Sequence, residues 1–157
     1  MKLNADIAIS SLQLGAMDKR IIARAEKTRA PVHAAMASQF LQCVYENFGA
    51  SGSFRIHEWA KLSAAYARRV NRDYATLNVT GKLRSAIKKS SSEVNGRVSV
   101  SKGECDYALA HQYGYEKNNL PARPYFPIRP DGSVLGSVKQ LVIASAKLAL
   151  TATLRNR

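Results

Sequence analysis

The chain has 157 residues, a length that fits one domain with a hydrophobic core of useful size. It carries 24 Lys and Arg against 11 Asp and Glu, which gives a formal net charge of +13. This charge favours a polyanion or an acidic protein surface as partner and says nothing about the fold. With only 2 cysteines, Cys43 and Cys105, the composition excludes a disulfide framework of the secreted type.

Neither end of the chain has the pattern of a membrane or export segment. The N-terminus lacks the continuous apolar stretch of a signal peptide. The longest apolar run, 141–154, contains Lys147 and is too short to cross a bilayer. We therefore expect a protein made in a reducing cytoplasm, with no membrane partner.

The first third of the chain predicts a strand followed by two helices. Apolar residues alternate over 3–9, which indicates a short edge strand. Helical spacing then begins at Leu14, is interrupted by Pro31, and continues in a second helix to about Phe48. Five apolar residues form the stripe that this second helix turns toward the core: Val32, Met36, Phe40, Cys43 and Val44.

A third helical segment begins at Trp59, the only tryptophan, with Leu62, Tyr66 and Val70 at helical spacing. Three arginines lie on or beside the opposite face: Arg68, Arg69 and Arg72. Such a face is either solvated or turned toward DNA or an acidic neighbour, and the sequence leaves both interpretations open.

A short helix is predicted over 80–87, with Thr80 accepting backbone N–H bonds at its start. The Gly81-Lys82 pair is not a phosphate-binding loop, because the preceding glycine and the following Ser or Thr of that motif are missing. Asn95-Gly96 predicts a β-hairpin near 87–101, with Val98 and Val100 pointing inward.

The segment 107–128 is the most distinctive of the chain. A helical turn over 107–113 ends at Gly114, which suits a left-handed helix terminus. After a polar connector, Pro121 and Pro124 hold Arg123 on a stiff, extended backbone. Its N–H donors are expected to tie carbonyls together or to meet a partner subunit. The next four residues, 125–128, suggest a short apolar strand.

The chain ends in a turn over 129–132 and a helix over about 137–154. This helix has four residues available for packing: Val138, Leu141, Val142 and Ala149. The elements together predict an α+β fold, in which a small antiparallel sheet packs against several helices, with long helices toward both ends.

The sequence contains no pattern typical of a catalytic or metal site. His33, His57 and His111 do not stand at metal-ligand spacing with Cys, Asp or Glu. Paired carboxylates are hard to assemble from 11 acidic residues. We expect no enzyme activity and no cofactor, and a structural role for His111.

Three runs stand out in this order along the chain: Thr80-Gly81 with Leu83, Tyr107-Ala108 with His111-Gln112 and Gly114, and Pro121-Ala122-Arg123-Pro124 with Phe126. With Trp59 upstream, this series resembles the virion morphogenesis family of tailed bacteriophages, the tail-completion proteins that include the Mu-like G protein. The resemblance is strongest over 31–128. The chain departs from it after Pro124, where the family usually has Phe-Leu-Gly and this chain has Tyr125-Phe126-Pro127. It departs also in the Asp131-Gly132 turn and in its alanine-rich C-terminal helix.

The resemblance implies a non-enzymatic structural subunit of the phage neck or tail top, needed for tail completion and head–tail joining. Such a subunit is expected to be part of the virion. It would form a homo-oligomeric ring, with a hexamer as the expected size, around the DNA channel. Its partners would be the connector or stopper and the tail terminator or tube. Five basic residues would face either the genomic DNA, by non-specific contacts, or acidic neighbours: Arg68, Arg69, Arg72, Lys88 and Lys89. The alternatives are a free basic nucleic-acid-binding protein and an assembly chaperone that is absent from the mature virion.

Overall fold

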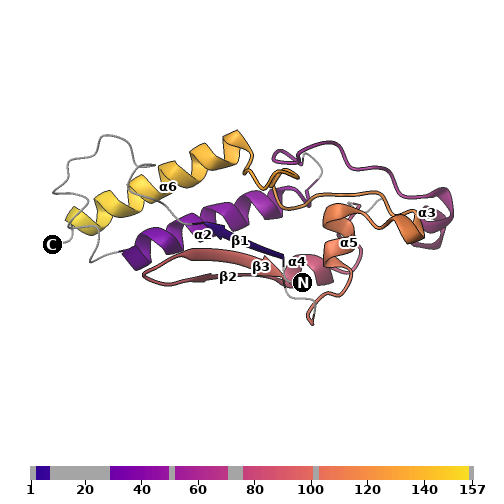
Figure 1. Ribbon diagram of the computed structural model, residues 1–157, viewed down its shortest axis with the longest axis horizontal. Coiled ribbons are helices and arrows are strands. Elements are labelled where there is room, and N and C mark those ends of the chain that lie inside the picture. Colours follow the sequence, from indigo (N-terminus) through magenta and orange to yellow (C-terminus); the bar gives the residue numbers. More distant parts are fainter. Residues whose placement is uncertain (1–2, 8–28, 50–51, 71–75, 101–102, 156–157) are drawn as a thin grey trace. The chain divides into compact units, whose positions relative to one another are not determined.

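The computed structural model describes residues 3–7, 29–49, 52–70, 76–100 and 103–155 (Figure 1). The strands are β1 (Leu3–Ile7), β2 (Ile87–Ser91) and β3 (Gly96–Val100). The helices are α2 (Arg29–Glu46), α3 (Ala64–Val70), α4 (Lys82–Ser85), α5 (Ala108–Tyr113), the 3-10 helix η3 (Glu116–Asn118) and α6 (Gly136–Arg155). The predicted α+β fold class is confirmed, including the hairpin and the two long helices. The helix expected from Leu14 falls outside the described residues.

The described residues form two compact units. Unit 1 comprises Leu3 and the described residues within 43–88 and 100–135. Unit 2 comprises the described residues within 4–42, 89–99 and 136–157. Each unit is described separately below.

In unit 2, helix α2 lies between the β2–β3 hairpin and helix α6 (Figure 1). Toward the hairpin, His33 Nδ1 donates to the carbonyl of Ser92 at 3.0 Å, and Lys89 Nζ donates to Ser38 Oγ at 2.7 Å. Toward α6, Ser145 Oγ donates to the carbonyl of Ala35 at 3.1 Å. These bonds hold α2 in the middle of a sheet–helix–helix arrangement.

Apolar residues at helical spacing supply the core of unit 2. Helix α6 buries one residue per turn, at a spacing of four: Val138, Val142, Ala146 and Leu150. The stripe predicted for α2 is buried along its whole length. The assignment of Leu141 to the packed face is wrong, because this residue lies one position off the buried row and is 39 % exposed. None of the described helices is long and apolar enough to span a membrane.

The sheet has the order β1-β3-β2, so that β1 is an edge strand as predicted. The Asn95-Gly96 pair does not form the hairpin turn. Ser92 N donates to the carbonyl of Asn95 at 2.8 Å, which places Glu93 and Val94 in the loop and Gly96 in β3. A Cβ atom on Gly96 would lie 2.5 Å from the carbonyl oxygen of His33. This glycine therefore lets β3 approach α2 closely.

Helix α3 in unit 1 is shorter than the sequence predicts. It begins after Ser63, whose Oγ accepts the N–H of Tyr66 at 3.3 Å and whose carbonyl accepts the N–H of Ala67 at 2.8 Å. Trp59 lies before the helix, in an irregular segment, and is buried. The apolar spacing from Trp59 onward thus overestimates the length of the helix, because a capping serine, Ser63, sets its start.

Candidate functional site

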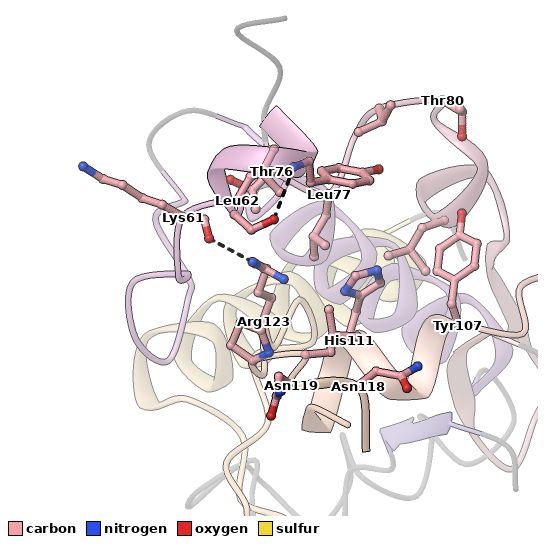
Figure 2. A pocket seen from close by; sticks show the side chains of 16 residues that line it. Lys61, Leu62, Thr76, Leu77, Thr80, Tyr107, His111, Asn118, Asn119 and Arg123 are labelled. Atoms are coloured by element: carbon pink, nitrogen blue, oxygen red, sulfur yellow. Dashed lines mark hydrogen bonds between the residues drawn. The ribbon is translucent and has the colours of Figure 1, made fainter. Parts of the chain in front are cut away.

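Unit 1 contains a cavity of about 790 Å³ (Figure 2). Its polar lining includes Lys61, Thr80, His111 and Arg123. Leucines such as Leu77 and tyrosines contribute the apolar part of the lining. Among the described residues that line it there is no Asp or Glu. Volumes of this size are typical of ligand-binding pockets, roughly 300–1,000 Å³. The cavity is therefore large enough for a ligand or a partner segment and has a positive lining.

Arg123 forms one wall of the cavity and is only 4 % exposed. Its Nε donates to the carbonyl of Ala60 at 2.9 Å, and its Nη2 donates to the carbonyl of Lys61 at 3.2 Å. Its main-chain N–H donates to the carbonyl of His111 at 2.6 Å. Burial lowers the pKa of the guanidinium from its usual value. The expectation that Arg123 ties carbonyls together is confirmed.

Gln112 organises the backbone that follows Arg123. Its Oε1 accepts the main-chain N–H groups of Tyr125 and Phe126 at 3.1 and 3.0 Å, and its Nε2 donates to the carbonyl of Phe126 at 3.4 Å. The strand predicted over 125–128 is therefore wrong. One glutamine side chain satisfies the amides of Tyr125 and Phe126, and the N–H of Ile128 donates to the carbonyl of Phe126 at 2.8 Å. The described residues there show only an isolated bridge between Ile128 and Val134.

His111 lies in the cavity wall beside Tyr107, whose ring meets it edge-on at 5.6 Å between centroids. Its Nδ1 is buried and has no hydrogen-bond partner within the part of the chain that the structure describes. Burial, and then the positive charge of Arg123, lower the pKa of His111 below 6.5. Burial also raises the pKa of Tyr107 to about 12. Both rings are thus uncharged at neutral pH.

The C-terminus of α2 and the loop after it are joined by two residues that the sequence analysis missed. Asn47 is fully buried; its Nδ2 donates to the carbonyls of Phe54 and Tyr125, both at 3.1 Å. Arg55 donates to the carbonyl of Asn47 through Nε and Nη2, at 3.0 and 2.8 Å, and to that of Gly49 at 2.7 Å. An asparagine in the last turn of the predicted helix, one residue beyond the observed end at Glu46, was the available signal.

Trp59 completes this region. Its indole Nε1 donates to the carbonyl of Pro124 at 3.1 Å in a buried position. The Arg55 guanidinium lies 4.0 Å from the centroid of the indole ring, and Phe48 packs against the ring edge-on at 6.1 Å. Trp59 therefore fixes the backbone beside Arg123.

Two glycines of the noted runs have backbone conformations that favour glycine. Gly81, not Thr80, precedes helix α4, with φ 71 and ψ −5, and no side chain caps this helix. Thr80 Oγ1 accepts the N–H of Lys82 at 3.4 Å. Gly114 has φ 80 and ψ 170, which is a region nearly restricted to glycine but not the left-handed helical conformation that we expected.

The other residues of these runs lie close by. Leu83 and Ala108 are buried, and the backbone nitrogen of Ala122 would lie 3.1 Å from a Cβ on Gly114. Pro121 lines the cavity, and Pro124 and Phe126 are buried.

The basic residues singled out from the sequence lie on two elements. Arg68 and Arg69 are exposed at the end of α3, where the Arg69 guanidinium stands 5.0 Å from the centroid of the Tyr66 ring. Lys88 and Lys89 are exposed on β2. Arg72 lies outside the described residues. In the described ranges, no group of three His, Cys, Asp or Glu side chains is placed to hold a metal ion.

No protein-family model matches the chain, and neither the curated proteins nor the solved structures include one that is detectably similar to it. The functional argument therefore depends on the sequence runs and on the geometry of unit 1.

Proposed function

We propose that this chain is a structural subunit of a tailed-phage neck or tail top, which completes the tail and joins it to the head. One observation supports this most directly: three of the residues that carry the resemblance bond the protein's own main chain. Trp59, Gln112 and Arg123 each donate to backbone carbonyls of unit 1. These side chains hold the backbone that forms a surface of unit 1, and we propose no catalytic or ligand-binding role for them.

This use of polar side chains suits a building block. A subunit that fits several neighbours needs irregular segments held in one conformation, because ordering a loop on binding costs affinity. In unit 1, buried side-chain bonds order such segments in advance. A ring also needs two different surfaces on each subunit that meet head to tail and close. In our proposal the ring, a hexamer, surrounds the DNA channel and contacts the connector or stopper on one side and the tail terminator or tube on the other.

In this proposal the exposed basic pairs Arg68-Arg69 and Lys88-Lys89 are contact residues. They would meet DNA phosphates in the channel without regard to sequence, or acidic surfaces of neighbouring proteins. Reversing the charge of all four residues should impair head–tail joining or DNA retention. Particles that still join heads to tails and keep their DNA would contradict this assignment.

The test of the proposed function is the composition of purified virions. We expect the chain at a fixed copy number per particle, and cryo-electron microscopy of the neck should show it as a ring. Its absence from infectious particles would overturn the proposal. A chain that is found on assembly intermediates but is lost from finished particles would be an assembly chaperone instead.

A free nucleic-acid-binding protein is the second candidate, favoured by the net charge of +13 and the exposed basic pairs. The two candidates differ in their response to salt. A true DNA-binding protein keeps useful affinity for duplex DNA at roughly 150 mM salt, whereas a few incidental phosphate contacts lose orders of magnitude in affinity between about 50 and 200 mM. Duplex binding that persists at the higher salt would favour this alternative.

A further inference from the structure

The tip of the β2–β3 hairpin carries an acidic residue beside a strongly exposed apolar one. Glu93 is exposed, and Val94 is 77 % exposed, more than any other large apolar residue recorded for the described chain. In a chain with 24 basic and 11 acidic residues, an exposed acid–valine pair at the end of a hairpin is conspicuous. Nothing in the packing of unit 2 requires it.

The tip is also held in one conformation. Ser92 Oγ accepts the N–H groups of Val94 and Asn95, both at 3.2 Å, and Ser92 N donates to the carbonyl of Asn95 at 2.8 Å. A preformed loop loses little conformational entropy when it binds. The tip thus has the physical properties of a docking element.

The cavity of unit 1 has the complementary character. Leucine and tyrosine side chains such as Leu77 and Tyr66 line it, and its described lining residues include no acidic side chain. Lys61 is an exposed residue of the lining, and its ammonium group extends away from Arg123 (Figure 2). We call this end of the cavity its mouth; Arg123 is buried in the wall. A carboxylate that stays at the rim can therefore meet Lys61 while an apolar side chain enters.

We propose that the hairpin tip of one copy of this chain docks into the unit 1 cavity of another copy, with Val94 inside and Glu93 paired with Lys61 at the mouth. Tip and cavity are different surfaces, so the contact is heterologous and builds a closed ring or an open filament. The inference specifies the subunit contact of the ring and rests on the proposed function for the claim that copies assemble.

A charge exchange tests the contact. Glu93→Lys and Lys61→Glu are substitutions of exposed residues, and each places like charges together at the contact. We expect each variant alone to weaken self-association roughly tenfold at low salt. Two substitutions with the same change of net charge serve as controls, Glu104→Lys and Lys139→Glu, both at exposed positions. Sedimentation velocity over a range of protein concentrations is the measurement.

Mixing the two variants gives the sharper result. In an equimolar mixture, the unchanged acidic tip of the Lys61→Glu chain meets the unchanged basic cavity mouth of the Glu93→Lys chain. The opposite contact joins the substituted, basic tip to the substituted, acidic mouth. Association should therefore return to near the wild-type level in the mixture and also in the double variant. Only a contact between chains is restored by mixing, because a contact within one chain would be rescued in the double variant alone.

Val94→Ser tests the apolar part of the contact without a change of charge. We expect weaker association, whereas Leu148→Ser, at a position that is 73 % exposed on α6, should leave association unchanged. Circular dichroism should show both variants to be as folded as the wild type, since neither side chain is buried.

Three outcomes decide the matter. Assembly that depends on Val94 and returns in the mixture supports the inference. Normal rings formed by the Glu93→Lys and Val94→Ser variants overturn it and leave the proposed function intact. A wild-type chain that remains monomeric at low salt and roughly 1 mM concentration also overturns it. The proposed function fails separately, if purified virions lack the chain.

Discussion

The two units keep their conformation by different means. Unit 2 is built from periodic apolar packing, in which α6 presents one buried residue per turn to its core, among them Val142 and Leu150. Unit 1 has short helices and long irregular segments, and single polar side chains such as Gln112 and Asn47 bond its backbone. A periodic core shares its stabilisation among many similar contacts. Unit 1 also buries an apolar and aromatic cluster that includes Phe48 and Phe126, but its irregular segments depend in addition on a few hydrogen bonds. The units should therefore respond differently to substitution.

The largest effect is expected at Gln112. Gln112→Leu replaces the amide side chain with an apolar one of similar size. It leaves the N–H groups of Tyr125 and Phe126 buried without an acceptor. Each unsatisfied buried donor costs about 1–3 kcal/mol, so the free energy of unfolding should fall by roughly 4 kcal/mol. Urea denaturation is the measurement. Gln140→Leu, at an exposed position on α6, is the matched control and should change stability by less than about 0.5 kcal/mol.

A small effect of Gln112→Leu would mean that the 125–128 backbone finds other partners, for example by pairing as the strand that its sequence suggests. The contrast between the two units would then be smaller than the structure indicates.

The second effect concerns the periodic core of unit 2. Leu150 is 2 % exposed, and Leu150→Ala should lower the free energy of unfolding by about 3 kcal/mol through lost apolar burial and the cavity left behind. Leu148→Ala, two residues earlier on the same helix and 73 % exposed, should cost less than about 0.5 kcal/mol. Thermal denaturation of both variants checks the pair, and equal costs would contradict the assigned face of α6.

The third effect is the loss of one hydrogen bond in unit 1. Trp59→Phe retains an aromatic ring against Phe48 but removes the N–H that the carbonyl of Pro124 accepts. The unsatisfied carbonyl and the smaller ring should together cost about 2 kcal/mol. Tyr113→Phe, at a side chain that is 60 % exposed, should be nearly neutral. A Trp59→Phe variant as stable as the wild type would show that packing alone holds this tryptophan.

The contrast between the units also explains what could be predicted from the sequence. The edge strand, α2 and α6 follow from apolar periodicity, and the structure has all three. The hairpin was predicted from the Asn95-Gly96 turn signal; it is present, although this pair does not form its turn. Periodicity fails where one residue decides the outcome. The capping residue Ser63 starts α3 later than the apolar spacing suggests. Gly96 lies in β3 and not in the turn, and at this position the backbone of His33 leaves no room for a side chain.

The candidate site was predictable only in part. The prolines around Arg123 indicated a stiff backbone and a role in bonding carbonyls, which the structure confirms. The cavity could not be inferred, because its lining is gathered from segments as far apart as Lys61 and Arg123. The roles of Asn47 and Arg55 depend on tertiary hydrogen bonds that leave no periodic trace in the sequence.

The smallest effect is a pH dependence that unit 1 should owe to His111. Its pKa in the folded chain lies below 6.5, because burial and then Arg123 oppose protonation, while in the unfolded chain it returns to about 6.5. Below 6.5 the unfolded state binds the proton more readily than the folded state does. Stability from this residue is therefore complete above about pH 6.5 and declines as the pH falls, until the folded form is protonated too.

His111→Gln removes the titrating group and should flatten this part of the stability curve. The measurement is urea denaturation of wild type and variant between about pH 7.5 and 5, with the difference between the two curves taken at each pH. His57→Gln, at an exposed position, is the control and should leave the wild-type curve unchanged. A wild-type chain that becomes more stable than His111→Gln as the pH falls would reverse the predicted sign. It would mean that the imidazolium finds a stabilising partner in the folded state, despite the nearby Arg123 charge and the lack of an acidic side chain among the described residues of the cavity lining.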